Sequence, residues 1–335
     1  MPVDESCIPL QSREEWQNAL KGVPHTFGHT WENSYAMHLT THLDTFLYSF
    51  SSDNVRIVCP IVERKCRGHI DIVKPFGFSG FTSSGNCPDF AHRWKRFARS
   101  RGYVCGYLGI NPLCDCGPTF NPDEVCQYDT IYVLDMTPTY EQLWANLSTN
   151  RRRQLRDWEQ ISSHLVIDQA PLIDFFLSHY VDFFQRKGAP LFYFFSRDTL
   201  SFLFELDNVL LVGAQNSKRI EAVSVFTYTE HVGEYLFNIS IPGGRHHATP
   251  LLWYGLTFLK SRGIPLLNLG GGSAEFKRRF GVRSLPLNCL KQIYRPNLYQ
   301  KLCTDLNLDP RVQSGYFPPY QERERRNAET ATDPD

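Results

Sequence analysis

The order of strands and helices in the second half of the sequence constrains the fold most. Three segments rich in Val, Leu, Phe and Tyr are separated by turn-forming residues and predict an antiparallel meander: 209–214, 220–228 and 233–241. The loop PGGRHHATP follows, then a helix over residues 250–262 with Thr249 as its N-cap, then a strand over residues 265–269. This order is typical of an α+β fold in which helices pack on a mainly antiparallel sheet.

The first part of the chain, residues 1–136, is expected to form its own domain of short strands and turns. Its predicted elements are strands at 45–50, 55–61, 70–73 and 103–108 and a helix at 89–100. The Gly- and Ser-rich loop over residues 75–88 is long for a plain connection, which favours a functional loop.

A second domain is expected over residues 137–318, followed by a disordered polar tail at 319–335. Thr139 with Gln142 predicts a capping box for a helix that also carries Arg151, Arg152, Arg153 and Arg156. Residues 191–196, LFYFFS, are predicted to be a core strand, with the hydroxyl of Tyr193 as a group that could face substrate.

Composition narrows the class of protein. The 335 residues carry 35 acidic and 35 basic side chains, and this balance argues against a protein that coats nucleic acid. No apolar run is long enough to span a bilayer, so we expect no membrane span and a cytoplasmic location. The ten cysteines lack paired CxxC spacing, so no metal site is predicted. The role of the cluster between Cys87 and Cys126 stays open.

The stretch LNLGGGSAEFKRRFG, residues 267–281, contains three consecutive glycines. It lacks the Gly-Lys-Ser/Thr end of a P-loop and the third glycine of a dinucleotide fingerprint. We interpret it as a strand end followed by a short helix capped by Ser273, with Phe276 and Phe280 facing inward. The cations Lys277, Arg278 and Arg279 are then expected to face outward or toward the mouth of a cleft.

Together these segments resemble the Fem-like, two-domain branch of the GNAT acyltransferase superfamily. The resemblance rests on EYLFNISIP, HHATPLLWYGLTFLKSRG, LLNLGGG and AEFKRRFG in this order, and it covers about 180 residues. It implies tandem GNAT-like domains, the first one degenerate, built of mainly antiparallel sheets flanked by helices.

The resemblance also implies an activity. An amine of a small molecule or cell-envelope precursor would attack the acyl group of an acyl-CoA directly, in a cleft between the domains, with no tightly bound cofactor. Aminoacyl-tRNA is the alternative donor, with a peptidoglycan precursor as acceptor, and nucleic acid would be a partner only in that case. A third possibility is a non-catalytic binding protein with the same fold.

Candidate site residues follow from these segments. The donor is expected near Gly243, Gly244, Arg245 and Thr249, where a helix start favours anions, and near Lys277 and Arg278. The candidate catalytic residues are His246, Glu275 and Tyr193, and the candidate substrate-binding residues are Arg152, Asn268 and Gly271. A solvated loop at PGGRHH and a solvated basic face at the arginines are the simpler alternatives.

Overall fold

The computed structural model describes residues 4–52, 55–114, 119–168, 170–217, 219–311 and 317–321. The chain divides into two compact units, and both are assembled from separate stretches of sequence. The first unit comprises Met1–Pro24, His42–Tyr128 and Asn288–Asp335, and the second comprises His25–Thr41 and Asp129–Leu287. The strands β7 (Val125–Asp135) and β13 (Arg283–Ile293) run from one unit into the other.

The boundaries of these units differ from those of the two continuous domains expected at 1–136 and 137–318. Residues 25–41 belong to the second unit, and those from Asn288 onward belong to the first. Of the polar tail expected at 319–335, residues 322–335 lie outside the part of the chain that the structure describes. Tyr320 is fully buried and its hydroxyl lies 3.1 Å from Cys105 Sγ, so residues 319–321 pack on the first unit.

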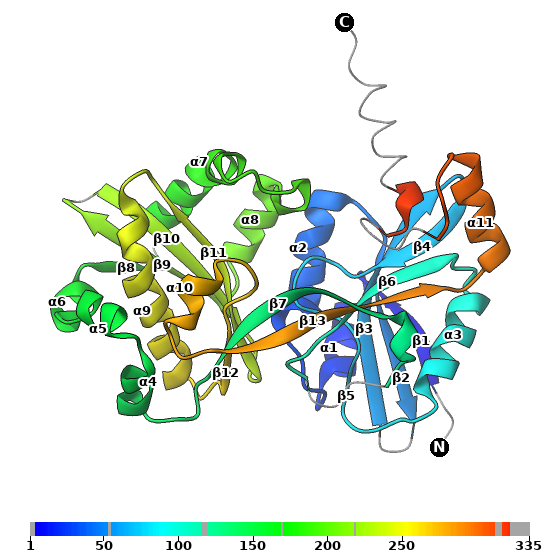
Figure 1. Ribbon diagram of the computed structural model, residues 1–335, viewed down its shortest axis with the longest axis horizontal. Helices are drawn as coiled ribbons and strands as arrows, with labels where there is room; N and C mark the ends of the chain where they lie inside the picture. The colour runs from blue at the N-terminus through cyan, green and yellow to red at the C-terminus, as the bar shows by residue number, and fades with distance from the viewer. Residues whose placement is uncertain are drawn as a thin grey trace, which may run out of the picture. The chain divides into compact units, whose positions relative to one another are not determined.

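The first unit is a sheet in the order β1-β2-β3-β4-β6-β13, with β5 beside β3 (Figure 1). All of its pairs are antiparallel except β4 with β6. The strands are β1 (Asp4–Pro9), β2 (Thr45–Ser52), β3 (Val55–Cys66), β4 (His69–Val73), β5 (Thr82–Ser83) and β6 (Cys105–Ile110). The helices are α1 (Arg13–Leu20), α3 (Phe90–Ser100), α11 (Pro296–Asp305) and the 3-10 turn η2 (Pro122–Glu124). The four strands and the helix predicted here are confirmed.

The second unit is a sheet in the order β7-β12-β11-β10-β9-β8, antiparallel except for β11 with β12. Its strands are β8 (Leu165–Ile167), β9 (Val209–Asn216), β10 (Arg219–Tyr228), β11 (Val232–Ser240) and β12 (Leu266–Asn268). Its helices are α2 (Trp31–Thr41), α4 (Tyr140–Asn146), α5 (Thr149–Gln154), α6 (Trp158–Ser163), α7 (Ala170–Arg186), α8 (Arg197–Phe204), α9 (Ala248–Ser261) and α10 (Ala274–Arg278). The 3-10 turns are η1 (Phe27–His29), η3 (Leu191–Tyr193) and η4 (Gly244–His247).

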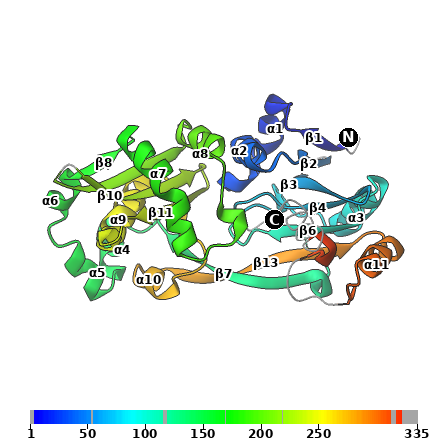
Figure 2. The ribbon, with the colours of Figure 1, turned by 90° about the horizontal axis from the view of Figure 1, so that it is seen from above.

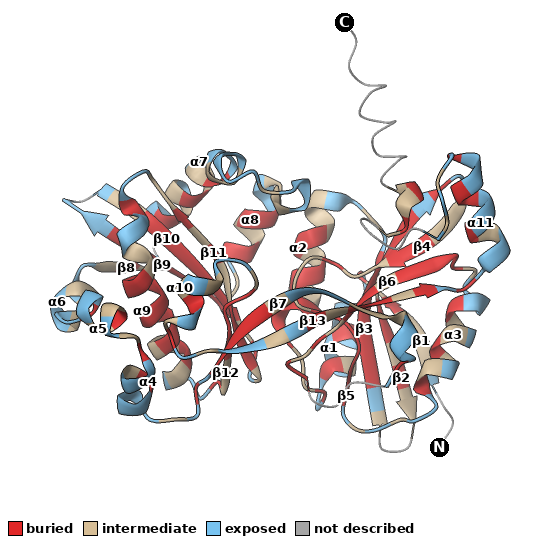
Figure 3. Ribbon diagram, viewed as in Figure 1, coloured by how far each residue is buried: buried red, intermediate tan, exposed pale blue. Residues whose placement is uncertain are grey.

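The predicted meander β9-β10-β11 is confirmed, and α7 and α9 cover its two faces (Figures 1 and 2). Glycines permit this close packing. A Cβ on Gly213 of β9 would lie 2.3 Å from Leu172 of α7, and one on Gly233 of β11 would lie 2.6 Å from Leu259 of α9. Figure 3 shows these strands as mainly buried, which places the core of this unit between the sheet and its helices. The α+β fold predicted from the sequence is confirmed.

Two local predictions are wrong. The arginine-bearing segment is three short helices rather than one, because Leu147 is extended and Ser148 accepts a new N-cap bond from Arg151 N at 3.4 Å. The stretch LFYFFS is not a core strand. It forms η3, in which Leu191 and Phe192 are 58% and 60% exposed, and then a loop. No helix in the described ranges combines the length and the apolar character needed to cross a bilayer.

Candidate active site

The sheet of the second unit opens between β11 and β12. The two strands pair in parallel only from Val232↔Leu266 to Glu234↔Asn268, whereas β11 continues to Ser240. Beyond Glu234, the edge of β11 therefore has no β12 partner within the described residues. Free backbone groups on such an edge can pair with an extended ligand.

Asn268 lies at the base of this opening. Its side chain is fully buried, and its Oδ1 accepts a 2.8 Å bond from Gly270 N. Its Nδ2 is buried without a hydrogen-bond partner among the described residues. A buried donor of this kind costs free energy unless a ligand or water accepts from it. Asn268 is therefore suited to contact a ligand.

Gly271 lies against Asp129 in the turn that follows. A Cβ at this position would lie 2.4 Å from Asp129 Oδ2, so only glycine fits without a shift of the carboxylate. The triple glycine thus brings the turn close to the first strand of the unit, and no phosphate is needed to explain it.

Lys277 is buried, which excludes the outward orientation, one of the two that the sequence predicts for it. Only 6% of the residue is exposed, and its Nζ donates to the carbonyl of Gly271. Burial lowers the pKa of Lys277 to about 8, and the nearby Asp129 carboxylate opposes this shift. No described carboxylate forms an ion pair with it. Arg278 is exposed, with its guanidinium 5.8 Å from the Tyr132 ring centroid.

Arg151, rather than Arg152, is the buried cation of α5. Its Nη1 donates to Thr249 Oγ1 at 2.8 Å and to Gln154 Oε1 at 2.7 Å, and its guanidinium lies 4.3 Å from the Phe276 ring centroid. Burial lowers the pKa of Arg151. This one side chain therefore joins α5, the first turn of α9 and α10. Arg152 is only half-buried and donates a long bond to Ala145 O.

The PGGRHH loop places the predicted donor residues at the far end of β11. Gly243 has a left-handed backbone (φ 93°) and open space around it, while Arg245 is exposed. Thr249 is buried inside α9 and does not cap it, because the helix already begins at Ala248. Gly244 is required for another reason: a Cβ there would lie 2.5 Å from Glu221 O.

Of the three predicted catalytic residues, His246 lies at this loop. It is exposed, and its Nδ1 lies 2.8 Å from Gly243 O. Its neighbour His247 is bonded through Nε2 to Glu221 Oε2 at 2.9 Å. This bond is the main cause that lowers the pKa of Glu221. The sequence gives no sign that Glu221 joins the histidines.

The other two predicted catalytic residues lie elsewhere. Tyr193, in η3, stacks on Phe184 with ring centroids 5.6 Å apart. Burial raises the pKa of Tyr193, and the Asp129 carboxylate adds to the shift. Glu275 is 84% exposed and pairs with Arg279.

The structure thus gathers Asn268, Gly271 and Lys277 at one turn, with Tyr193 near enough to Asp129 to sense its charge. His246 and Glu275 are not part of that group. The nine cysteines that the structure describes are free, and Cys116 lies outside the described residues.

Comparison with known proteins places this fold. No protein-family model matches the sequence, and no curated protein matches it. Among solved structures, the match to FemX covers 90% of this chain and 99% of the FemX chain, at 9% identity and a TM-score of 0.59. The match to a conserved protein of unknown function from Bacteroides thetaiotaomicron covers 87% of this chain and 100% of that protein's chain, at 8% identity and a TM-score of 0.56. The match to L-PGS from Bacillus licheniformis covers 83% of this chain and 91% of the L-PGS chain, at 14% identity and a TM-score of 0.50. The chain therefore has the fold of FemX, as expected from its resemblance to the Fem-like proteins.

Proposed function

We propose that the protein is an acyltransferase that moves an acyl group from an acyl-CoA to an amine of a small molecule or cell-envelope precursor. The observation that carries this proposal is Lys277, a buried cation in contact with the turn that follows β12. Its Nζ donates to Gly271 O and forms no ion pair with a described carboxylate, and the nearby Asp129 carboxylate offsets only part of the effect of burial. A buried charge is costly unless something of opposite sign compensates it. A bound anion or a developing oxyanion would supply that compensation.

The donor would lie along the free edge of β11. Its extended arm can pair with the backbone beyond Glu234, and its phosphates can reach the loop at Gly243 and Arg245 and the start of α9. Arg245 supplies an exposed positive charge there, and Gly243 leaves the loop uncrowded.

The reaction needs few side chains. The amine nitrogen attacks the thioester carbonyl, the new N–C bond forms, and the C–S bond breaks as the thiolate leaves. The ammonium of Lys277 and the free Nδ2 of Asn268 would stabilise the oxyanion between these steps. Tyr193, whose raised pKa keeps it protonated, would give its proton to the thiolate and regain one from solvent. The proton released by the amine passes to solvent.

A direct test measures thiol release from acyl-CoA with a panel of amines, and Arg245→Ala examines the donor site. Because Arg245 is exposed, its loss should weaken CoA binding about 5- to 10-fold, as expected for one charged contact, without changing stability. Arg153→Ala removes an exposed arginine on α5 and is the matched control.

Two outcomes would contradict parts of this proposal. If no amine yields thiol and CoA does not raise the melting temperature, the acyl-CoA donor is wrong. If product forms only with charged tRNA and is lost after ribonuclease treatment, acyl transfer stands but the donor is an aminoacyl ester.

The pH dependence of turnover tests the role of Lys277. Its ammonium is the form that stabilises an oxyanion, so kcat should fall as pH rises through about 8, where Lys277 loses its proton. Lys277→Arg should shift this decline to higher pH, because the guanidinium stays charged. A kcat that instead rises through pH 8 in the unsubstituted protein, with the rise lost in Lys277→Arg, would contradict this role and indicate that Lys277 acts as a base.

A further inference from the structure

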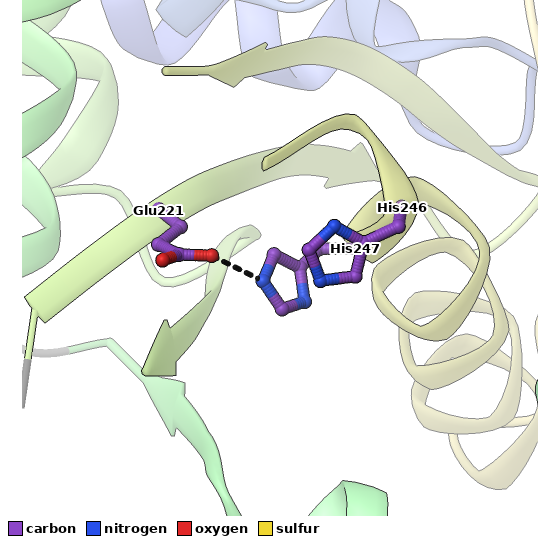
Figure 4. Close-up of side chains that lie close together, drawn as sticks. All are labelled: Glu221, His246 and His247. Carbon is purple, nitrogen blue, oxygen red and sulfur yellow. Dashed lines mark hydrogen bonds and ion pairs between the residues drawn. The ribbon is translucent and has the colours of Figure 1, made fainter. Parts of the chain in front are cut away.

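A carboxylate and two imidazoles converge in the second unit, where Glu221 of β10 faces His246 and His247 of η4 (Figure 4). Each can offer one ligand atom, and these three atoms lie within 4.8 Å of one another. Within the described ranges, no other group of three His, Cys, Asp or Glu residues comes together in this way.

A β-bulge aims the carboxylate at this point. The pairing of β10 with β9 shifts between Ile220 and Ala222, which leaves Glu221 without a partner in β9. Bulges redirect the side chain of the extra residue and are common beside functional sites. The Glu221 carbonyl instead accepts a 3.0 Å bond from Ile241 N, just before the glycine turn.

Close backbone packing holds the histidines against this bulge. A Cβ on Gly244 would lie 2.5 Å from Glu221 O, so the absence of a side chain lets η4 rest directly on β10. The rings of His246 and His247 have centroids only 3.8 Å apart, although the residues are adjacent in sequence. The ligand atoms are therefore positioned by backbone contacts before any ligand arrives.

The surrounding hydrogen bonds suit metal ligands. His246 Nδ1 lies 2.8 Å from Gly243 O, and donation to that carbonyl leaves the lone pair on Nε2 free. Metal-bound histidines usually donate their other ring nitrogen in this manner.

We propose that Glu221, His246 and His247 bind one divalent transition-metal ion of the zinc class. Two imidazoles and one carboxylate favour zinc, cobalt or nickel over calcium or magnesium, and three protein ligands leave one position open. Bonds of about 2.0–2.2 Å place tetrahedral ligands roughly 3.4 Å apart, so small side-chain rotations suffice. The ion would replace the bond between His247 and Glu221 and fix η4 to β10. The metal site shares the loop at residues 243–247 with the proposed donor site, but metal binding is measured without acyl transfer, so either proposal can fail while the other stands.

The test is a titration of the chelator-treated full-length protein with Co²⁺, followed by absorption spectroscopy and calorimetry. One equivalent should bind, with visible absorption typical of a four- or five-coordinate ion. His246→Ala, His247→Ala and Glu221→Gln should each weaken binding at least tenfold or abolish it. His164→Ala is the matched control, because His164 is also exposed and has its Nδ1 2.7 Å from a backbone carbonyl.

Glu221→Gln separates a metal site from a simple hydrogen-bonded pair. The amide can still accept a bond from His247 but is a poor metal ligand. Without metal, the variant should therefore have the same melting temperature as the unsubstituted apo protein. Addition of Zn²⁺ should raise the melting temperature of the unsubstituted protein but not that of the variant. The proposal is overturned if the unsubstituted protein binds no equivalent of Co²⁺, or if the three variants bind it as tightly as His164→Ala does.

Discussion

Replacing Lys277 with methionine should abolish most acyl transfer and, at neutral pH, stabilise the fold. The side chain is of similar length, but the buried positive charge at the carbonyl of Gly271 is lost. Removal of one group that stabilises an oxyanion commonly costs about 10²–10³ in kcat. The measurement is kcat for the best donor and amine, with the melting temperature recorded for the same samples.

The expected gain in stability follows from the pKa of Lys277. It is about 8 in the folded protein, against an ordinary value of 10.5. Between these values the unfolded chain holds the proton and the folded chain does not, so the Lys277 contribution to stability rises with pH in this window. Below pH 8 the buried charge costs roughly 3 kcal/mol.

Methionine removes this cost but also the bond to Gly271 O, which contributes about 1 kcal/mol. The net gain in the free energy of unfolding is therefore about 2 kcal/mol at pH 7. It should vanish near pH 10 and become a loss of up to about 1 kcal/mol at higher pH, where the lysine is neutral in both states. Urea unfolding of both proteins at pH 7 and pH 10 measures this difference.

Lys260→Met is the matched control. Lys260 also donates to a backbone carbonyl, that of Met136 at 2.7 Å, and lies 5.3 Å from the Tyr140 ring centroid, but it is only half-buried. This variant should retain activity and show no gain in stability. Full turnover by Lys277→Met would refute the catalytic role, and a loss of stability at pH 7 would refute the cost of the buried charge.

The strands and helices that frame the site could be predicted because their signals are local. The meander carries dense β-branched and aromatic segments, and Thr139 with Gln142 forms the predicted capping box, with bonds of 2.9 and 3.3 Å. A long periodic segment such as α9 was also predicted within two residues of its ends. These features require no knowledge of distant contacts.

The burial of single charges could not be predicted in this way. Lys277 is followed directly by Arg278 and Arg279, and α10 is too short for its apolar spacing to show which cation faces inward. The approach of Glu221 to His247 depends on a bulge and on the packing of Gly244, and neither leaves a mark in the local sequence. The aromatic segment 191–196 looks like a core strand, yet part of it is exposed.

Arg151→Met should destabilise the second unit by about 2–3 kcal/mol and lower kcat, whereas Arg152→Met should do neither. Arg151 loses its bonds to Thr249 and Gln154 and its contact with the Phe276 ring, which together outweigh the relief from burying a charge. Because Arg151 joins α5 and α9 to α10, its loss should also loosen the helix that carries Lys277.

Paired measurements on Arg151→Met, Arg151→Lys and Arg152→Met test this argument by urea unfolding and by kcat. Lysine keeps the charge but lacks the planar guanidinium that stacks on the Phe276 ring, so Arg151→Lys should lie between the wild-type protein and Arg151→Met. If Arg151→Met is as stable as the wild-type protein, the free-energy cost of burying the guanidinium equals the stabilisation from its hydrogen bonds and ring contact. If its kcat is also unchanged, Arg151 does not support Lys277, and α10 must be held by the inward-facing Phe276 and Phe280 alone.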